Sequence, residues 1–256
     1  MNVPADVAWQ DRVPEVAVTS SGAVSAVESP DVRGLLRVGG WAALASVALI
    51  VVQVVVFAVW PPVHTVPEIF ALMNTNPVLG LVSLDVLYVV NNLLVWLFYL
   101  GLGAALFPVS RSAVILAVGL GTLQMGAYVA SNPAVEMLTL ARAHATADAP
   151  GRAALAAAGE AVLTGWKGTA FLTYYFLGAI VLFVFFWLLR RTTVFPPATA
   201  WWALASGVLM LVPSSFGTIG LVFALASLVP WSVLCVVGGR RLLRLAAGRE
   251  ASAAAR

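Results

Sequence analysis

The sequence predicts an all-α fold: a polytopic membrane helix bundle with six transmembrane helices and amphipathic helices in the outer loops. Composition is the first observation behind this prediction. Of the 256 residues, 61% are hydrophobic and 10% are charged, whereas soluble domains carry roughly 25% charged residues. The other two observations are that the apolar residues form long blocks almost free of charge, and that the arginines collect in alternate connections between those blocks.

The apolar blocks match the length that a membrane requires, because a hydrocarbon core of roughly 30 Å needs about 20 residues of helix. The expected spans are residues 38–60, 78–107, 113–130, 169–189, 198–212 and 217–237. Only Pro213, Ser214, Ser215 and Phe216 separate the last two, so these form a tight helical hairpin or one interrupted element. Together they cover 40 residues, which is too long for one span and suits two.

The two ends of the chain differ from the bundle, which is expected over residues 33–245. Residues 1–32 carry five acidic side chains, one arginine and three prolines, without a hydrophobic signal-peptide core. This composition predicts a disordered acidic tail. Residues 246–256 are predicted to form a second, short tail.

The distribution of positive charge predicts the orientation. Eleven of the 14 Lys and Arg residues lie in the N-terminal segment, in alternate short connections and in the C-terminal tail; Arg142, Arg152 and Lys167 lie elsewhere. Because positive residues accumulate on the cytoplasmic side, both termini are expected to be cytoplasmic. The excess of Arg over Lys, with abundant Ala, Val and Gly, is typical of GC-rich bacterial genomes, so a bacterial inner membrane is the expected location.

The long connection after the third block carries helix signals of its own. Asn132 before Pro133 predicts a helix that runs to about His144, and Asp148 before Pro150 predicts another. A third short helix is expected over residues 67–73. We expect these helices to be amphipathic and to lie over the outer end of the bundle.

Asp85 is the acidic residue that interrupts an otherwise apolar block. A charge at the bilayer centre costs roughly 2.5–3.5 kcal/mol on insertion scales, so the side chain should face protein or water. At about 100° per residue, one helix face carries Asp85, Tyr88, Asn92, Trp96 and Tyr99, and Asn91 lies just off the edge of this face. Hydrogen bonding between helices is one explanation for this polar stripe, and a solute or proton site is the other.

The last two blocks carry a second polar interruption, at residues 213–220. Pro230 should kink the final helix because it cannot donate to the Ala226 carbonyl, and Ser227 lies nearby to help satisfy that group. A turn and a structural kink explain these residues. Broken helices are also typical of binding sites in transporters.

These features lead to one preferred functional hypothesis, in which a cavity open to the outside binds or transports a small solute, with Asp85 as a titratable group. The predicted lining consists of Asp85, Tyr88, Asn91, Asn92, Ser214, Ser215 and Thr218, and the predicted outer mouth of Glu68, Glu136 and Glu160. A membrane scaffold or regulatory subunit, bound to another membrane protein, is the alternative. A hydrolase that uses outer Glu and His residues with a metal is a third hypothesis.

No motif predicts a cofactor, a metal or a nucleic acid. His64 and His144 lie outside the expected spans, and no HExxH pattern is present. The glycines at 119, 121 and 126 fall in a membrane helix rather than in a strand–turn–helix context, so they do not predict nucleotide binding. The basic character comes from the arginines that set the orientation, which does not indicate nucleic-acid binding.

Four stretches resemble a family of bacterial six-helix integral membrane proteins that is classified as a domain of unknown function. They are NTNPVLGLVSLDVLYVVNNLL (74–94), SNPAVEMLTL (131–140), AALAAAGEAVLTGWKGTAF (153–171) and VLMLVPSSFGTIGLVFALASLVPW (208–231). The resemblance covers about residues 33–245. It implies six helices, and it implies no activity because the family has no established one.

Overall fold

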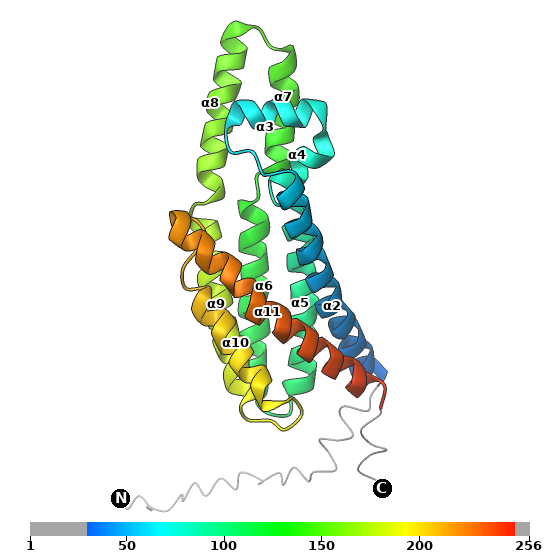
Figure 1. Cartoon of the computed structure of the whole chain (residues 1–256). Helices are drawn as coiled ribbons and strands as arrows, with labels where there is room; N and C mark the ends of the chain where they lie inside the picture. The colour runs from blue at the N-terminus through cyan, green and yellow to red at the C-terminus, as the bar shows by residue number, and fades with distance from the viewer. Residues whose placement is uncertain (1–29, 249–256) are drawn as a thin grey trace, which may run out of the picture.

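The computed structural model describes residues 30–248, and all regular secondary structure in that range is helical (Figure 1). The helices are α2 (Pro30–Val59), α3 (Val66–Thr75), α4 (Pro77–Ser83), α5 (Val86–Leu106), α6 (Arg111–Ser131), α7 (Ala134–Thr146), α8 (Ala149–Trp166), α9 (Thr169–Leu189), α10 (Pro197–Leu209) and α11 (Gly217–Ala246). α2 begins inside the predicted acidic tail, and the rest of that tail, residues 1–29, lies outside the described residues. So do residues 249–256 of the predicted C-terminal tail.

Five helical segments among the described residues are long and apolar enough to cross a membrane, as expected of a multi-pass membrane protein. They are Val32–Val59, Val86–Leu106, Arg111–Thr146, Ala149–Leu189 and Gly217–Ala246. α10, which corresponds to the fifth of the six predicted spans, has 13 residues. At about 1.5 Å per residue it is roughly 20 Å long, shorter than a hydrocarbon core of roughly 30 Å, so a sixth crossing stays a prediction.

Three helices lie beyond one end of the bundle. α7 follows α6 after a break at Asn132 and Pro133, and α8 leads into α9, so that α7 and α8 project as a hairpin (Figure 1). α3 lies across this hairpin, in the place where the sequence predicts a short helix. α3 and α7 share an apolar core, and Val162, Leu163 and Trp166 of α8 pack against it. The buried residues of this core are Val66, Ile69, Phe70, Met73, Leu84, Ala134, Met137 and Ala141.

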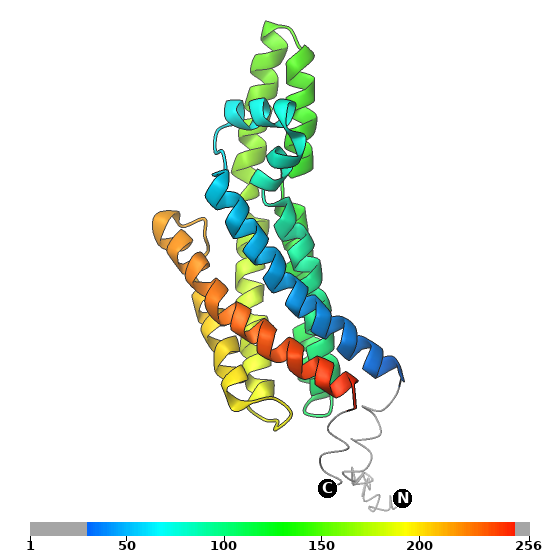
Figure 2. The same cartoon turned by 45° about the vertical axis from the view of Figure 1, so that its right-hand side comes forward.

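At the other end, α2, α5 and α11 approach closely through glycines. A Cβ atom on Gly39 would lie 2.7 Å from the Gly101 Cα, and one on Gly40 would lie 2.9 Å from the Gly239 carbonyl oxygen. Small residues of this kind allow helix backbones to touch within a membrane. From this contact α2 and α11 diverge toward the first residue of α11 (Figures 1 and 2). The divergence leaves room for side chains of the other helices between them.

The helix predicted over residues 78–107 is broken at Asp85. α4 ends at Ser83, α5 begins at Val86, and Asp85 adopts a left-handed conformation with φ 60° and ψ 26°. Asp tolerates this conformation better than most residues and disfavours helix interiors, which explains why the break falls here. The Asn132 side chain donates a 2.8 Å hydrogen bond to the Leu84 carbonyl oxygen beside the break. Asp85 therefore precedes α5 rather than lying within a continuous helix.

Candidate functional site

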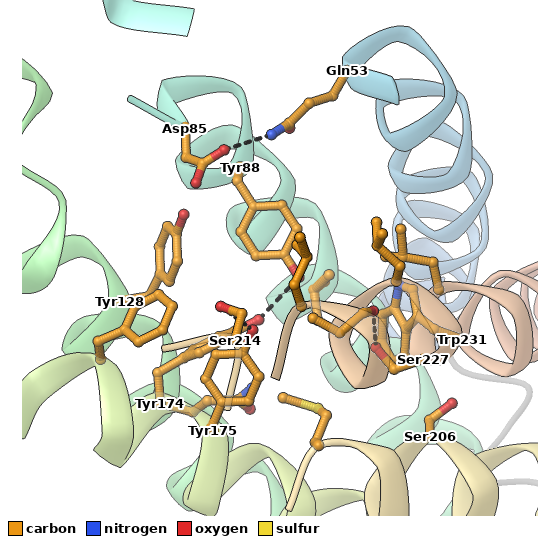
Figure 3. A pocket seen from close by; sticks show the side chains of 18 of the residues that line it. Gln53, Asp85, Tyr88, Tyr128, Tyr174, Tyr175, Ser206, Ser214, Ser227 and Trp231 are labelled. Carbon is orange, nitrogen blue, oxygen red and sulfur yellow. Dashed lines mark hydrogen bonds between the residues drawn. The ribbon is translucent and has the colours of Figure 1, made fainter. Parts of the chain in front are cut away.

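A cavity of about 260 Å³ lies inside the bundle (Figure 3). Residues of α2, α5, α6, α9, α10 and α11 contribute to its wall, together with Asp85, Met210 and Ser214 from the connections. Its lining consists of Gln53, Phe57, Asp85, Tyr88, Val95, Tyr99, Gln124, Tyr128, Phe171, Tyr174, Tyr175, Ser206, Met210, Ser214, Leu221, Ala224, Leu225, Ser227, Leu228 and Trp231. The cavity thus joins segments that are widely separated in the sequence.

All five tyrosines of the chain line this cavity, although they come from three helices. The Tyr88 and Tyr174 hydroxyls are 3.2 Å apart, within hydrogen-bond distance. The Tyr128 ring packs against both, with centroid distances of 5.2 Å to Tyr88 and 4.9 Å to Tyr174. Tyr175 stands edge-on to Tyr174 at 5.4 Å and donates a 3.0 Å hydrogen bond to the Ser214 hydroxyl. Tilted and edge-on ring pairs of this kind form a stable aromatic wall.

Asp85 and Gln53 form one end of the cavity. The Gln53 side-chain amide donates a 2.8 Å hydrogen bond to Oδ1 of Asp85 (Figure 3). The second carboxylate oxygen points toward the side of the cavity where Tyr128 lies (Figure 3). This end therefore presents an acidic group with a neutral hydrogen-bond donor beside it.

Farther along the cavity, two buried polar side chains have atoms without a hydrogen-bond partner. Gln124 and Ser206 are 2% and 1% exposed, and neither Gln124 Oε1 nor Ser206 Oγ has a partner. Leaving such a group unsatisfied costs about 1–3 kcal/mol. Both residues line the cavity, so a molecule bound there can supply the hydrogen bonds that the protein lacks.

α11 provides a wall that reaches the surface of the bundle. Leu221 and Leu225 line the cavity, yet they are 53% and 54% exposed. Two residues after Leu225, the Ser227 hydroxyl donates a 2.7 Å hydrogen bond to the Ala224 carbonyl. The sequence predicts that Ser227 donates to the Ala226 carbonyl, which Pro230 leaves without its helical partner. This contact goes to the Ala224 carbonyl instead.

Three of the seven residues predicted for the cavity line it: Asp85, Tyr88 and Ser214. Asn91 instead accepts a 2.7 Å hydrogen bond from Ser46, and both side chains are buried. Asn92 donates a 2.8 Å hydrogen bond to the Tyr88 carbonyl of its own helix. Neither amide lines the cavity: Asn91 is bonded to α2, and Asn92 is bonded within its own helix. Ser215 and Thr218 also lie outside the lining; the Ser215 hydroxyl is buried without a partner and Thr218 is exposed.

The residues predicted for the outer mouth lie on the three helices beyond the bundle. Glu68 is on α3, Glu136 on α7 and Glu160 on α8; all three are exposed and none lines the cavity. Glu68 forms a capping box with Thr65, whose hydroxyl lies 2.7 Å from the carboxylate and lowers the pKa of Glu68. Among residues 30–248, no group of three or more His, Cys, Asp or Glu side chains is arranged to hold a metal ion.

Sequence reasoning missed most of the polar lining, namely Gln53, Gln124, Tyr128, Tyr174, Tyr175 and Ser206. Two signals were available. Gln53 and Gln124 are amides within apolar blocks, as Asp85 is a carboxylate within one. The tyrosines are few, and all of them fall within the predicted spans.

The fold and the cavity define a class, that of multi-pass helical membrane proteins with an aromatic cavity between the helices. Comparisons of the chain with protein-family models, curated proteins and solved structures returned no match. The assignment of function therefore depends on the chemistry of the cavity.

Proposed function

We propose that this protein binds a small solute in the aromatic cavity, which would act as the receptor site of a solute-binding or solute-transporting membrane protein. The observation that carries the proposal is the pair of buried polar atoms without a hydrogen-bond partner, Gln124 Oε1 and Ser206 Oγ, on residues in the wall of a cavity of about 260 Å³. Tight packing would have eliminated such a space in a purely structural bundle. A solute with polar groups would satisfy both side chains, as ligand sites typically combine an apolar wall with a few polar groups.

The proposal includes six crossings, with both termini in the cytoplasm of a bacterium. The basic side chains near the turns that follow α5 and α9 support this orientation, because Lys and Arg accumulate in cytoplasmic loops, and their contacts with aromatic rings are typical of a membrane interface. The Arg111 guanidinium is 5.6 Å from the centre of the Phe107 ring, and that of Arg191 is 4.0 Å from the centre of the Trp187 ring. In this orientation α10 and residues 210–216 make the fifth crossing, and α3, α7 and α8 form an outer cap.

Access to the proposed site would come from the outer half of the bundle. The close contact of Gly39 with Gly101, and of Gly40 with Gly239, supports a closed inner end. The exposed Leu221 and Leu225 support an entrance beside α11. Asp85 would be the first charged group that an entering solute meets.

Binding can be tested with three probes of nearly one shape. They are choline, its neutral carbon isostere tert-butylethanol (3,3-dimethylbutan-1-ol), and the anion tert-butylacetate (3,3-dimethylbutanoate). Ala224→Trp places an indole in the cavity lining. Val222→Trp is the matched control, because Val222 lies two residues away on the same helix, is 58% exposed and does not line the cavity. Calorimetric titration of the purified full chain should detect at least one probe bound to the wild type and to Val222→Trp, but not to Ala224→Trp. If no probe binds, or if binding survives in Ala224→Trp, the proposal is wrong.

A scaffold or regulatory subunit remains the second candidate. The Ser46–Asn91 contact favours this candidate, because the polar side chain of Asn91 takes part in packing between helices. Both side chains are buried and satisfy each other between α2 and α5, so they serve packing rather than a solute. Purification from native membranes in mild detergent tests this candidate. A stoichiometric complex with another membrane protein supports it, and a monodisperse single chain argues against it.

A further inference from the structure

The cavity lining combines an acidic side chain with many aromatic rings. Asp85 is the acidic residue in the lining, and no Lys, Arg or His is among the described residues that line it. Eight lining residues are aromatic: Phe57, Tyr88, Tyr99, Tyr128, Phe171, Tyr174, Tyr175 and Trp231. Aromatic ring faces carry negative electrostatic potential and attract ammonium groups, most strongly where water is excluded.

We propose that the solute is a small organic cation, with an ammonium group held among the tyrosine rings beside Asp85 and an apolar body in the rest of the cavity. This inference rests on the proposed function and names the substrate class of the same site. A carboxylate placed next to several ring faces is the combination that binds ammonium groups, since one supplies charge and the other a weakly hydrated surface.

The hydrogen-bond partner of Asp85 leaves its charge uncompensated within the cavity. Gln53 is neutral, so its amide satisfies one carboxylate oxygen without supplying positive charge. Lys167, between α8 and α9, does act electrostatically on Asp85. However, its ammonium lies 5.6 Å from the centre of the Trp166 ring, and Lys167 does not line the cavity. A bound cation would therefore bring the opposite charge to a carboxylate that is costly to bury alone.

Other classes of solute fit the lining less well. An anion would meet Asp85 without a basic side chain in the wall to compensate it. A neutral solute would satisfy Gln124 and Ser206 as well as a cation does, but it would leave Asp85 without a counter-charge. Polar groups at both ends with rings between them suit a cation that also carries a hydroxyl or carbonyl group.

The test compares choline, tert-butylethanol and tert-butylacetate by calorimetric titration, because the three probes differ mainly in charge. In the wild type, choline should bind at least about tenfold more tightly than tert-butylethanol, and tert-butylacetate should bind most weakly. Asp85→Asn removes the charge, keeps the shape and tolerates the left-handed conformation, so it should reduce the preference for choline to less than about threefold.

A second variant keeps the proposal testable if Asp85→Asn does not fold. Lys167→Gln leaves the cavity lining intact and removes a positive charge that acts on Asp85, so choline should bind more tightly. Weaker choline binding by Lys167→Gln, equal wild-type affinity for choline and tert-butylethanol, or an unchanged preference in Asp85→Asn would each overturn the cation inference. Each of these outcomes leaves solute binding itself in place, whereas no binding of any probe overturns the proposed function.

Discussion

The Gln53 side chain donates a 2.8 Å hydrogen bond to Asp85 and thereby connects α2 to the residue that precedes α5. The contact lies at an end of the cavity, away from the glycines that bring α2 and α5 together. The same Asp85 is the non-glycine residue with positive φ within residues 30–248. Its backbone conformation and its carboxylate can therefore be tested separately.

The left-handed backbone of Asp85 predicts an unusual order of stability. Asp85→Gly and Asp85→Val both lose the hydrogen bond from Gln53, so the loss of that bond cancels when the two variants are compared. A β-branched residue is strained at φ 60°, whereas glycine is not. We expect Asp85→Val to unfold more easily than Asp85→Gly by about 1–2 kcal/mol, measured by denaturation in detergent. Equal stabilities of the two variants would contradict the conformation described here.

The glycine contacts of α2 predict a position-dependent effect of alanine. On Gly39, a Cβ would lie 2.7 Å from the Gly101 Cα, and neither backbone can give way without separating the helices. Gly39→Ala should therefore destabilise the bundle by about 1–3 kcal/mol. Gly34→Ala is the control on the same helix, because a Cβ there meets nothing within 4 Å. That control should be neutral or stabilising by up to about 1 kcal/mol, since alanine favours helix more than glycine does.

Different kinds of physical information explain which features the sequence predicts. Long apolar blocks predict helices because a membrane demands them, and Asp148 predicts the start of α8, which it caps. The helix expected after Asn132 is present as α7, but its N-cap is Pro133, and Asn132 is the C-cap of α6. Asp85 was recognised because a carboxylate is costly in an apolar block. The break at Asp85 was not predicted, since nothing in the spacing of residues reports a positive φ. Periodicity assigns Tyr128 and Tyr174 to faces of their own helices, but their meeting depends on how α6 and α9 are rotated against α5.

The Ser46–Asn91 hydrogen bond predicts energetic coupling between α2 and α5. Each single alanine variant leaves one buried polar atom without its partner, whereas the double variant removes both. A double-mutant cycle on the free energy of unfolding should give a coupling of about 0.6 kcal/mol and at most about 1.7 kcal/mol, the average and the maximum found for hydrogen bonds between membrane helices. Additive effects of Ser46→Ala and Asn91→Ala would show that the contact does not contribute to stability.

The capping box of α3 predicts that the stability of this helix depends on pH. Hydrogen bonds from Thr65 lower the pKa of Glu68 from its ordinary value of 4.5. The ionised cap therefore stabilises α3 above about pH 4.5, and this contribution is lost as the pH falls through the lowered pKa. Hydrogen-exchange protection of α3 should decrease in acid in the wild type.

Glu68→Gln separates this effect from general acid destabilisation. The variant should show weaker protection of α3 at neutral pH and little further decrease in acid. Thr139→Ala is the control, since Thr139 is exposed on α7 and donates a hydrogen bond only within that helix. The same acid response in Glu68→Gln and in the wild type would exclude Glu68 as the group responsible.

The proposed orientation predicts opposite labelling of two exposed positions. Cys235 is the one cysteine of the chain and is buried, so Cys235→Ala gives an unlabelled background. On that background, Ala145→Cys places a thiol near the tip of the α7–α8 hairpin, and Thr193→Cys places one in the α9–α10 turn; both positions are exposed. In intact bacterial cells, a membrane-impermeant maleimide should label Ala145→Cys directly but should label Thr193→Cys only after permeabilisation. The reverse pattern would put Arg190 and Arg191 outside, against the tendency of basic residues to stay in the cytoplasm, and would invert the side from which a solute reaches the cavity.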